Sequence, residues 1–104
     1  MSTFDDRQHA FETKFAHDAT MQFKAEARRN RLLGLWAAEK LGKAGDEADA
    51  YAKEVVRSDF EEAGDEDVYR KVSGDLGDRA SEKEIRDKMA SLMSEAKGQI
   101  AAEN

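Results

Sequence analysis

Residues 21–42 read MQFKAEARRNRLLGLWAAEKLG, and the run LLGLWAA at 32–38 is apolar on nearly every side of a helix. A helix of this kind is usually packed on several sides at once. We therefore predict a helix from about Met21 to Leu41, stopped by Gly42 and Gly45. Gly34 costs this helix about 1 kcal/mol relative to alanine. We interpret it as the point where a neighbouring helix or an aromatic ring comes close.

The predicted helix offers apolar surface on two sides, which favours a position between several neighbours. One face carries Met21, Ala25, Leu32, Leu35 and Trp36, and the other side carries Leu33, Ala37 and Leu41.

Three further helices are predicted toward the C-terminus. Asp46 is expected to cap the next helix and Gly64 to end it. A short helix at 65–76 follows, and residues 74–79 are expected to be a loose segment. Ser81 and Glu84 have the spacing of a capping box at the start of the last helix. That helix has the clearest apolar stripe in the sequence, formed by Ile85, Met89, Leu92, Met93, Ala96 and Ile100.

The composition agrees with an all-α fold built on a thin core. Ala, Glu, Lys, Leu and Arg make up 52 of the 104 residues, there is no proline, and 17 residues are alanine. Val, Ile, Leu and Phe together number only 17, which is low for a globular domain. We predict a small four-helix bundle with an additional short helix and a partly separate N-terminal helix. The two expected parts are residues 1–19 and residues 20–104.

Charge is divided unevenly along the chain. Residues 1–42 carry a net charge of +1 and residues 43–104 a net charge of −7. A basic patch lies at 24–31, and an acidic patch with six carboxylates in nine positions lies at 59–67. The two patches either attract each other within the bundle or each face a partner.

Several classes of function are disfavoured by the residues present. The absence of cysteine excludes disulfides, thiolate metal sites and thiol nucleophiles. His9 and His17 do not complete a metal site or a catalytic group, so we expect neither. Gly42-Lys43 is not followed by the Ser or Thr of a phosphate loop. The net negative charge of the chain argues against nucleic-acid binding. No apolar stretch is long enough for membrane insertion and no secretory signal is visible, so we expect a cytoplasmic protein.

A narrow apolar stripe marks the N-terminus. Phe4, Phe11 and Phe15 lie within about 40° of one another around a helix axis, and the stripe stops near residues 18–20, where Asp18 or Thr20 is expected to cap the next helix. The three rings either belong to the bundle core or form a helix that binds in a groove of another protein.

Parts of this sequence resemble the ζ (zeta) subunit family of alphaproteobacterial ATP synthases. The segments that carry the resemblance are FDDR (4–7), FE (11–12), KFAHD (14–18), FK (23–24) and ARRNRLLGLWAA (27–38). The resemblance implies an inhibitor of ATP hydrolysis, not an enzyme, whose N-terminal helix enters the catalytic head of the F-type ATP synthase near the large subunits and the rotor. It also implies that residues 20–104 anchor the inhibitor, and that it lies peripheral to the inner membrane through the synthase.

Residue roles follow from the same resemblance. Within residues 1–19, three phenylalanines would be apolar anchors, and five polar residues would form the rim around them. We expect no cofactor. We also expect the free protein to be a monomer. The expected partner-binding residues are Phe4, Asp5, Arg7, Phe11, Glu12, Lys14, Phe15 and Asp18.

Two other functions stay open at this point. The chain could be a small bundle that binds adenine nucleotide weakly, with a wall formed by Arg28, Arg31, Trp36 and Tyr51. It could also be an assembly factor of the same complex that leaves the hydrolysis rate unchanged.

Overall fold

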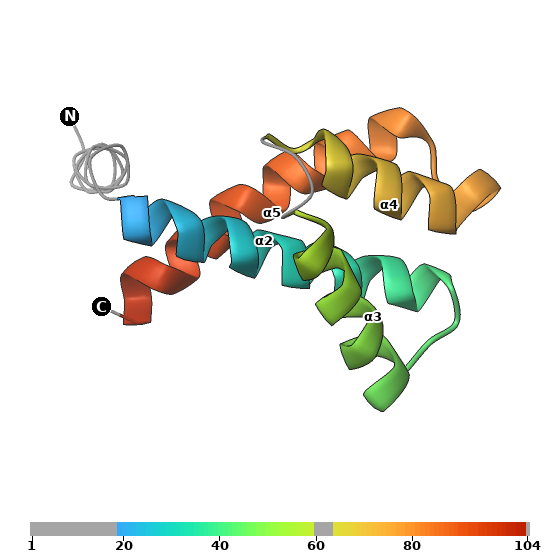
Figure 1. The fold of residues 1–104 in the computed structure, drawn as a ribbon, viewed down its shortest axis with the longest axis horizontal. Helices are drawn as coiled ribbons and strands as arrows, with labels where there is room; N and C mark the ends of the chain where they lie inside the picture. Colours follow the sequence, from blue (N-terminus) through green and yellow to red (C-terminus); the bar gives the residue numbers. More distant parts are fainter. Residues whose placement is uncertain (1–18, 60–63, 104) are drawn as a thin grey trace.

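Helix α2, Ala19–Lys40, is the element against which the other helices pack (Figure 1). A computed structural model describes residues 19–59 and 64–103. In these ranges α2 is followed by α3 (Asp46–Ser58), α4 (Glu66–Leu76), the 3-10 turn η1 (Gly77–Arg79) and α5 (Glu82–Glu103). No strand occurs among the described residues. The all-α prediction is therefore confirmed.

The end of α2 is a Schellman motif, as the glycine at position 42 predicts. Gly42 has a φ of 78°, and its N–H donates to the Glu39 carbonyl at 3.1 Å. The Lys43 N–H donates to the Ala38 carbonyl at 2.9 Å. These two bonds satisfy carbonyl groups that the last helical turn leaves open.

Burial on α2 differs in detail from the predicted faces. Leu33 and Ala37 are completely buried, whereas Leu32, Leu35 and Trp36 are only half-buried. The predicted close approach at Gly34 is confirmed, because a Cβ at this position would lie 2.6 Å from the Ala52 Cα of α3. The glycine lets the two helix backbones meet, and this contact places Leu33 and Ala37 at the centre of the bundle.

Helix α3 is shorter than the sequence suggested, and its predicted cap is wrong by one position. Gly45, with a φ of 57°, occupies the N-cap position, and Asp46 is the first helical residue. The helix ends at Ser58, whose hydroxyl donates to the Val55 carbonyl at 2.6 Å. Gly64 therefore does not end α3, and residues 60–63 lie outside the described range. Thr20 lies within α2 and is not its cap.

The segment predicted to be loose at 74–79 is largely helical. Residues 74–76 form the last turn of α4, and residues 77–79 form η1. Leu76 is fully buried, which holds this turn against the core. One of the two hydrogen bonds of the predicted capping box at the start of α5 is confirmed, because the Glu84 N–H donates to Ser81 Oγ at 3.1 Å.

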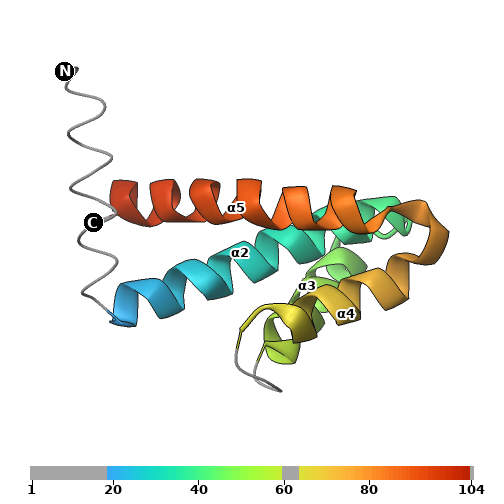
Figure 2. The same cartoon turned by 90° about the horizontal axis from the view of Figure 1, so that it is seen from above.

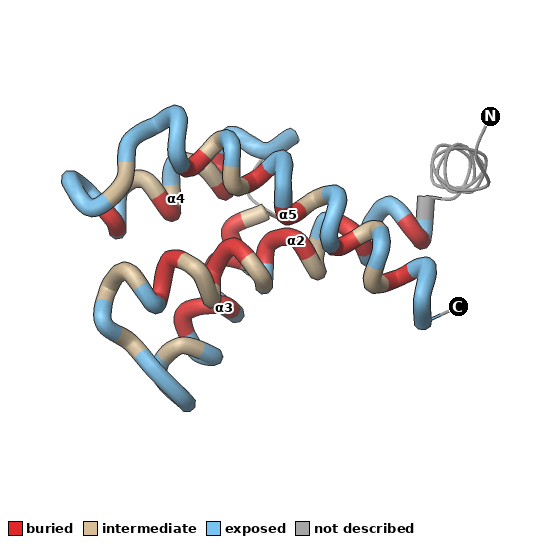
Figure 3. Tube along the Cα trace, turned by 180° about the vertical axis from the view of Figure 1, so that it is seen from behind, coloured by how far each residue is buried: buried red, intermediate tan, exposed pale blue. Residues whose placement is uncertain are grey.

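The core has a main cluster between all four helices and a smaller one at one end (Figure 3). The smaller cluster joins Met21 and Ala25 of α2 to Ile100 of α5. At this end the first half of α2 and the last half of α5 extend beyond α3 and α4, and Figures 1 and 2 show them crossing and then spreading apart. We call residues 19–28 and 96–103 the two-helix arm. The five buried residues of α5 fall on its predicted stripe: Ile85, Met89, Leu92, Ala96 and Ile100.

Candidate functional site

The residues predicted to bind a partner all lie before the described part of the chain, which starts at Ala19. Their placement in a binding site stays a prediction. What the structure does define is the scaffold to which that segment is joined, since Ala19 stands at the tip of the two-helix arm (Figure 1).

Polar contacts tie the two helices of the arm together. Arg28 of α2 donates to the Gln99 side chain at 2.9 Å, and its guanidinium lies 2.8 Å from Glu103. The hydrogen bond from Arg28 lowers the pKa of the Glu103 carboxyl. Together with the apolar cluster of Met21, Ala25 and Ile100, these contacts hold the start of α2 and the end of α5 against each other.

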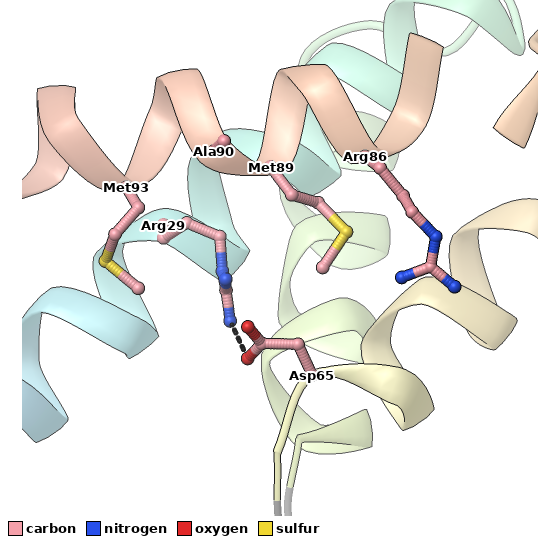
Figure 4. Close-up of a pocket in the computed structure, with 6 residues that line it drawn as sticks. All are labelled: Arg29, Asp65, Arg86, Met89, Ala90 and Met93. Atoms are coloured by element: carbon pink, nitrogen blue, oxygen red, sulfur yellow. Dashed lines mark hydrogen bonds and ion pairs between the residues drawn. The ribbon is translucent and has the colours of Figure 1, made fainter. Parts of the chain in front are cut away.

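A buried arginine connects α2 to the start of α4. Arg29 is only 2% exposed, and its Nη2 donates to Asp65 Oδ1 at 2.8 Å (Figure 4). Its Nε donates to Asn30 Oδ1 at 2.6 Å. Asn30 is fully buried and its Nδ2 has no hydrogen-bond partner of good geometry in the described structure. Because a buried charge is costly unless it is paired, these bonds fix the position of Arg29.

Carboxylates gather around this arginine. Burial raises the pKa of Glu26, and the negative charges of Asp59 and Asp65 raise it further, against the opposing charge of Arg29. Burial also raises the pKa of Asp59; the nearby Asn30 amide and Arg29 oppose this effect, whereas neighbouring acids add to it. Glu26, Asp59 and Asp65 thus all lie near the guanidinium of Arg29.

The two charged patches of the sequence meet through this cluster. Arg29 of the basic patch pairs with Asp65 of the acidic patch, so mutual attraction within the bundle is confirmed for this pair. Arg28 instead pairs with α5, and Lys24 and Arg31 are exposed. Only part of the basic patch is therefore used inside the bundle.

A hollow of about 390 Å³ lies beside Arg29, between α2, the start of α4 and α5 (Figure 4). Besides Arg29 and Asp65 it is lined by Arg86, Met89, Ala90 and Met93. Arg86 donates to Glu82 at 2.9 Å and to Glu66 at 3.1 Å, and its guanidinium stacks over Tyr69 at 4.0 Å.

Both arginines of this hollow are already bonded to carboxylates. The remaining lining consists of methionine and alanine, so the hollow suits an apolar side chain better than a phosphate group. It contains no group arranged as a nucleophile with a general base, and we assign it no chemistry.

The four residues of the predicted nucleotide wall lie in separate places. Arg28 bonds to α5, whereas Arg31 is exposed on α2. Trp36 lies under the ammonium groups of Lys40 and Lys88, 5.1 Å and 6.0 Å from its ring centroid. None of the four lines the 390 Å³ hollow.

Tyr51 contacts α4. It is buried on α3, and its hydroxyl donates to Asp75 Oδ2 of α4 at 2.9 Å. Burial raises the pKa of the Tyr51 hydroxyl, and the bond to Asp75 raises it further. Nucleotide binding by this set stays a prediction.

Two other types of site are absent from residues 19–59 and 64–103. No three His, Cys, Asp or Glu side chains are grouped so that they could hold a metal ion. None of the helices in these ranges has both the length and the apolar character needed to cross a membrane.

The sequence analysis assigned no site role to three residues that the structure brings forward. Asp65 and Arg86 line the hollow, and Phe23 is a large apolar side chain that is 57% exposed. Phe23 could have been found from its position, since it lies on the side of the helix away from Ala25 and next to Lys24. The other two depend on how α4 and α5 pack, which the periodicity of a single helix does not contain.

Known proteins similar to this chain were found in two of three comparisons. The sequence model of a family described as ATPase inhibitor subunit zeta matches residues 1–99. A structure solved by NMR in solution is 64% identical, covers 81% of this chain and 99% of that chain, and superposes with a TM-score of 0.76. A search of the curated proteins found no match.

Proposed function

This chain belongs to the family of ATPase inhibitor zeta subunits, and we propose that it inhibits ATP hydrolysis by the F-type ATP synthase. The match to residues 1–99 is the observation that carries this proposal, since it includes the N-terminal segment as well as the bundle. Residues 1–19 would be the inhibitory element and residues 20–104 the anchoring bundle. The inhibitor would lie in the cytoplasm, held at the inner membrane by the synthase.

In this proposal the N-terminal helix enters the catalytic head near the rotor and blocks rotation in the hydrolytic direction. Phe4, Phe11 and Phe15 would bury their rings in a groove, as amphipathic helices do when they bind. The effect on turnover is then set by how much better the helix binds one conformational state of the enzyme than the others. Such an inhibitor needs no catalytic group of its own.

The described structure supports this division of roles in one respect. Both apolar clusters of the described core, and the Arg28 and Arg29 contacts, are made by α2, α3, α4 and α5. Residues 19–59 and 64–103 therefore contain an apolar core to which all four described helices contribute. An anchor of this kind would keep its fold whether or not the N-terminal segment is bound.

The test is hydrolysis by the isolated synthase with added full-length or truncated protein. Removing residues 1–18 is expected to abolish inhibition and leave the unfolding transition of the bundle in place. A triple variant, Phe4→Ala with Phe11→Ala and Phe15→Ala, is expected to need at least about 100-fold more protein for half-inhibition, since buried aromatic anchors dominate interfaces.

A matched control keeps the three rings and removes polar side chains from the same segment. His9→Ala with Thr13→Ala, on the side of the helix away from the three rings, is expected to inhibit within a few-fold of the wild type. Equal inhibition by the truncated and full-length proteins would refute the proposed role of residues 1–18.

A further inference from the structure

The direction of the first turns of α2 depends on their contacts with the end of α5. These turns extend beyond α3 and α4, and the two helices of the two-helix arm spread apart toward their ends (Figures 1 and 2). Met21 and Ala25 are buried, and both pack in one apolar cluster with the buried Ile100 of α5. This cluster therefore holds the start of α2 to the last turns of α5.

Arg28 adds a polar connection between the same two helices. It donates to the Gln99 side chain at 2.9 Å and lies 2.8 Å from the Glu103 carboxylate. Gln99 and Glu103 are four positions apart, so they lie on one face of α5. A single ion pair near the surface contributes little to the free energy of unfolding. We expect these bonds to act mainly on the angle between α2 and α5.

The angle of α2 matters because the proposed inhibitory segment is joined to the chain at Ala19. Nine positions separate Ala19 from Arg28, which corresponds to about 13 Å along the helix axis. A change of about 20° in the direction of α2 at Arg28 would therefore move Ala19 by about 5 Å. A tethered segment binds more tightly when its point of attachment is held where binding requires it, since this raises its effective concentration.

We propose that Arg28 and Ile100 are positioning residues for inhibition. By fixing the direction in which α2 leaves the bundle, they direct residues 1–18 toward the groove of the ATPase. Both act through contacts inside their own chain. This inference rests on the proposed function and adds to it that the end of α5, far in sequence from the inhibitory segment, controls how well that segment binds.

The first test changes the polar connection in the full-length protein. Arg28→Ala is expected to raise the concentration for half-inhibition by about 3- to 10-fold, because the effective concentration of the segment falls. The unfolding midpoint is expected to change little.

A charge swap distinguishes positioning from a direct contact with the enzyme. Arg28→Glu with Glu103→Arg keeps an ion pair between α2 and α5, and the Gln99 amide can donate to the new carboxylate at position 28. The swapped protein is expected to recover most of the inhibition that Arg28→Ala loses. If it inhibits as poorly as Arg28→Ala, the positioning role of Arg28 is refuted.

The second test uses two isoleucines of the same helix. Ile100 and Ile85 are both buried on α5, but Ile85 belongs to the main cluster of the core. Ile100→Ala and Ile85→Ala are both expected to lower the unfolding midpoint. At a temperature where both variants are folded, only Ile100→Ala is expected to weaken inhibition. Equal losses would show an effect of stability alone. Replacement of each isoleucine by valine gives the same comparison if an alanine variant does not fold.

A third test measures the angle without the ATPase. The chain has no cysteine, so Gln22→Cys with Ala101→Cys can carry a pair of spin labels at exposed positions of α2 and α5. The distance distribution between the labels is expected to broaden when Arg28→Ala is added and to narrow again in the charge-swapped protein. A control pair on α3 and η1, Ala50→Cys with Asp78→Cys, is expected to show no change. An unaltered distribution between positions 22 and 101 in the Arg28→Ala protein would overturn the inference.

These results separate the inference from the function on which it rests. If the wild type inhibits and the triple phenylalanine variant does not, the proposed function stands. Full inhibition by both Arg28→Ala and Ile100→Ala would then refute the positioning role alone. A wild-type protein that fails to inhibit would overturn the proposed function and this inference with it.

Discussion

Replacing Gly34 by alanine is expected to destabilise the bundle, although alanine is the better helix former. A Cβ at position 34 would lie 2.6 Å from the Ala52 Cα, 3.1 Å from the Ala52 Cβ and 3.3 Å from Val55 Cγ2. Carbon atoms in contact normally stand about 3.5–4.0 Å apart. Helix α3 would therefore have to move by about 1 Å, since a backbone atom cannot rotate out of the way as a side chain can.

The magnitude follows from two opposing effects. An added methyl in a packed interior costs about 1–3 kcal/mol, and the backbone contact at Ala52 places Gly34→Ala near the upper end of that range. Alanine is a better helix former than glycine, and this effect alone would stabilise the folded protein by about 1 kcal/mol. The net loss of unfolding free energy is about 2 kcal/mol, which lowers the melting temperature of a domain this size by about 8–16 °C.

Gly98 of α5 provides the matched control. It also lies inside a helix, but a Cβ there meets nothing within 4 Å. Gly98→Ala therefore keeps the helical benefit without the clash and is expected to stabilise the protein by about 0.5–1 kcal/mol. The same chemical change is expected to have opposite signs at the two positions.

Urea unfolding followed by far-ultraviolet circular dichroism measures both effects as changes of midpoint at constant slope. A Gly34→Ala protein as stable as the wild type would refute the argument, since it would mean that α2 and α3 stand farther apart than described.

Two further predictions concern pH and capping. The pKa values of Glu26 and Asp59 are raised in the folded protein, which means that ionisation of these carboxyl groups opposes folding. The stability that their protonated forms provide is present in acid. It is lost as the pH rises from their ordinary pKa values through the raised pKa values. Glu26→Gln with Asp59→Asn is therefore expected to be more stable than the wild type at neutral pH, and the difference in urea midpoint is expected to shrink toward pH 4; a constant difference would contradict the assignment. Ser81→Ala removes the oxygen that accepts the Glu84 N–H and is expected to cost about 1 kcal/mol, measured by the same unfolding assay, with Ser91→Ala on the exposed side of α5 as the control.

Some features confined to one helix were predicted from the sequence. The glycine at 34 and the end of α2 at Gly42 are local patterns, and each has the structural meaning expected of it. The cap at Asp46 and the end of α3 at Gly64 were predicted wrongly. The stripe of α5 is also correct, because one apolar face repeated at helical spacing has few other uses.

The charge arrangement could not be predicted in the same way. Arg29 and Arg28 are neighbours in a run of basic residues, yet the first is 2% exposed and the second pairs with the far end of α5. Helical periodicity places the two side chains about 100° apart, but it does not say which of them points toward Asp65. That choice depends on the crossing of α2 with α4 and α5, and the hollow beside Arg29 depends on it too.

The candidate site also combines residues that the sequence singled out with residues whose role depends on the tertiary structure. The sequence singled out residues 4–18, which precede the described structure, so their contacts stay a prediction. Phe23 entered the sequence analysis only as part of the resemblance, because a lone ring on a polar face has no pattern. Its 57% exposure is a property of the tertiary structure.

The distribution of phenylalanine connects the thin core to the proposed function. The described core is built from alanine, valine, leucine, isoleucine, methionine and Tyr51, and no phenylalanine is among its buried residues. Of the five phenylalanines in the chain, three stand at positions 4, 11 and 15, and Phe23 is exposed. Large rings contribute most when they fill a pocket. Our proposal assigns the three N-terminal rings to a pocket of the partner, so replacing them by alanine is expected to weaken inhibition and to leave the unfolding midpoint of the bundle unchanged.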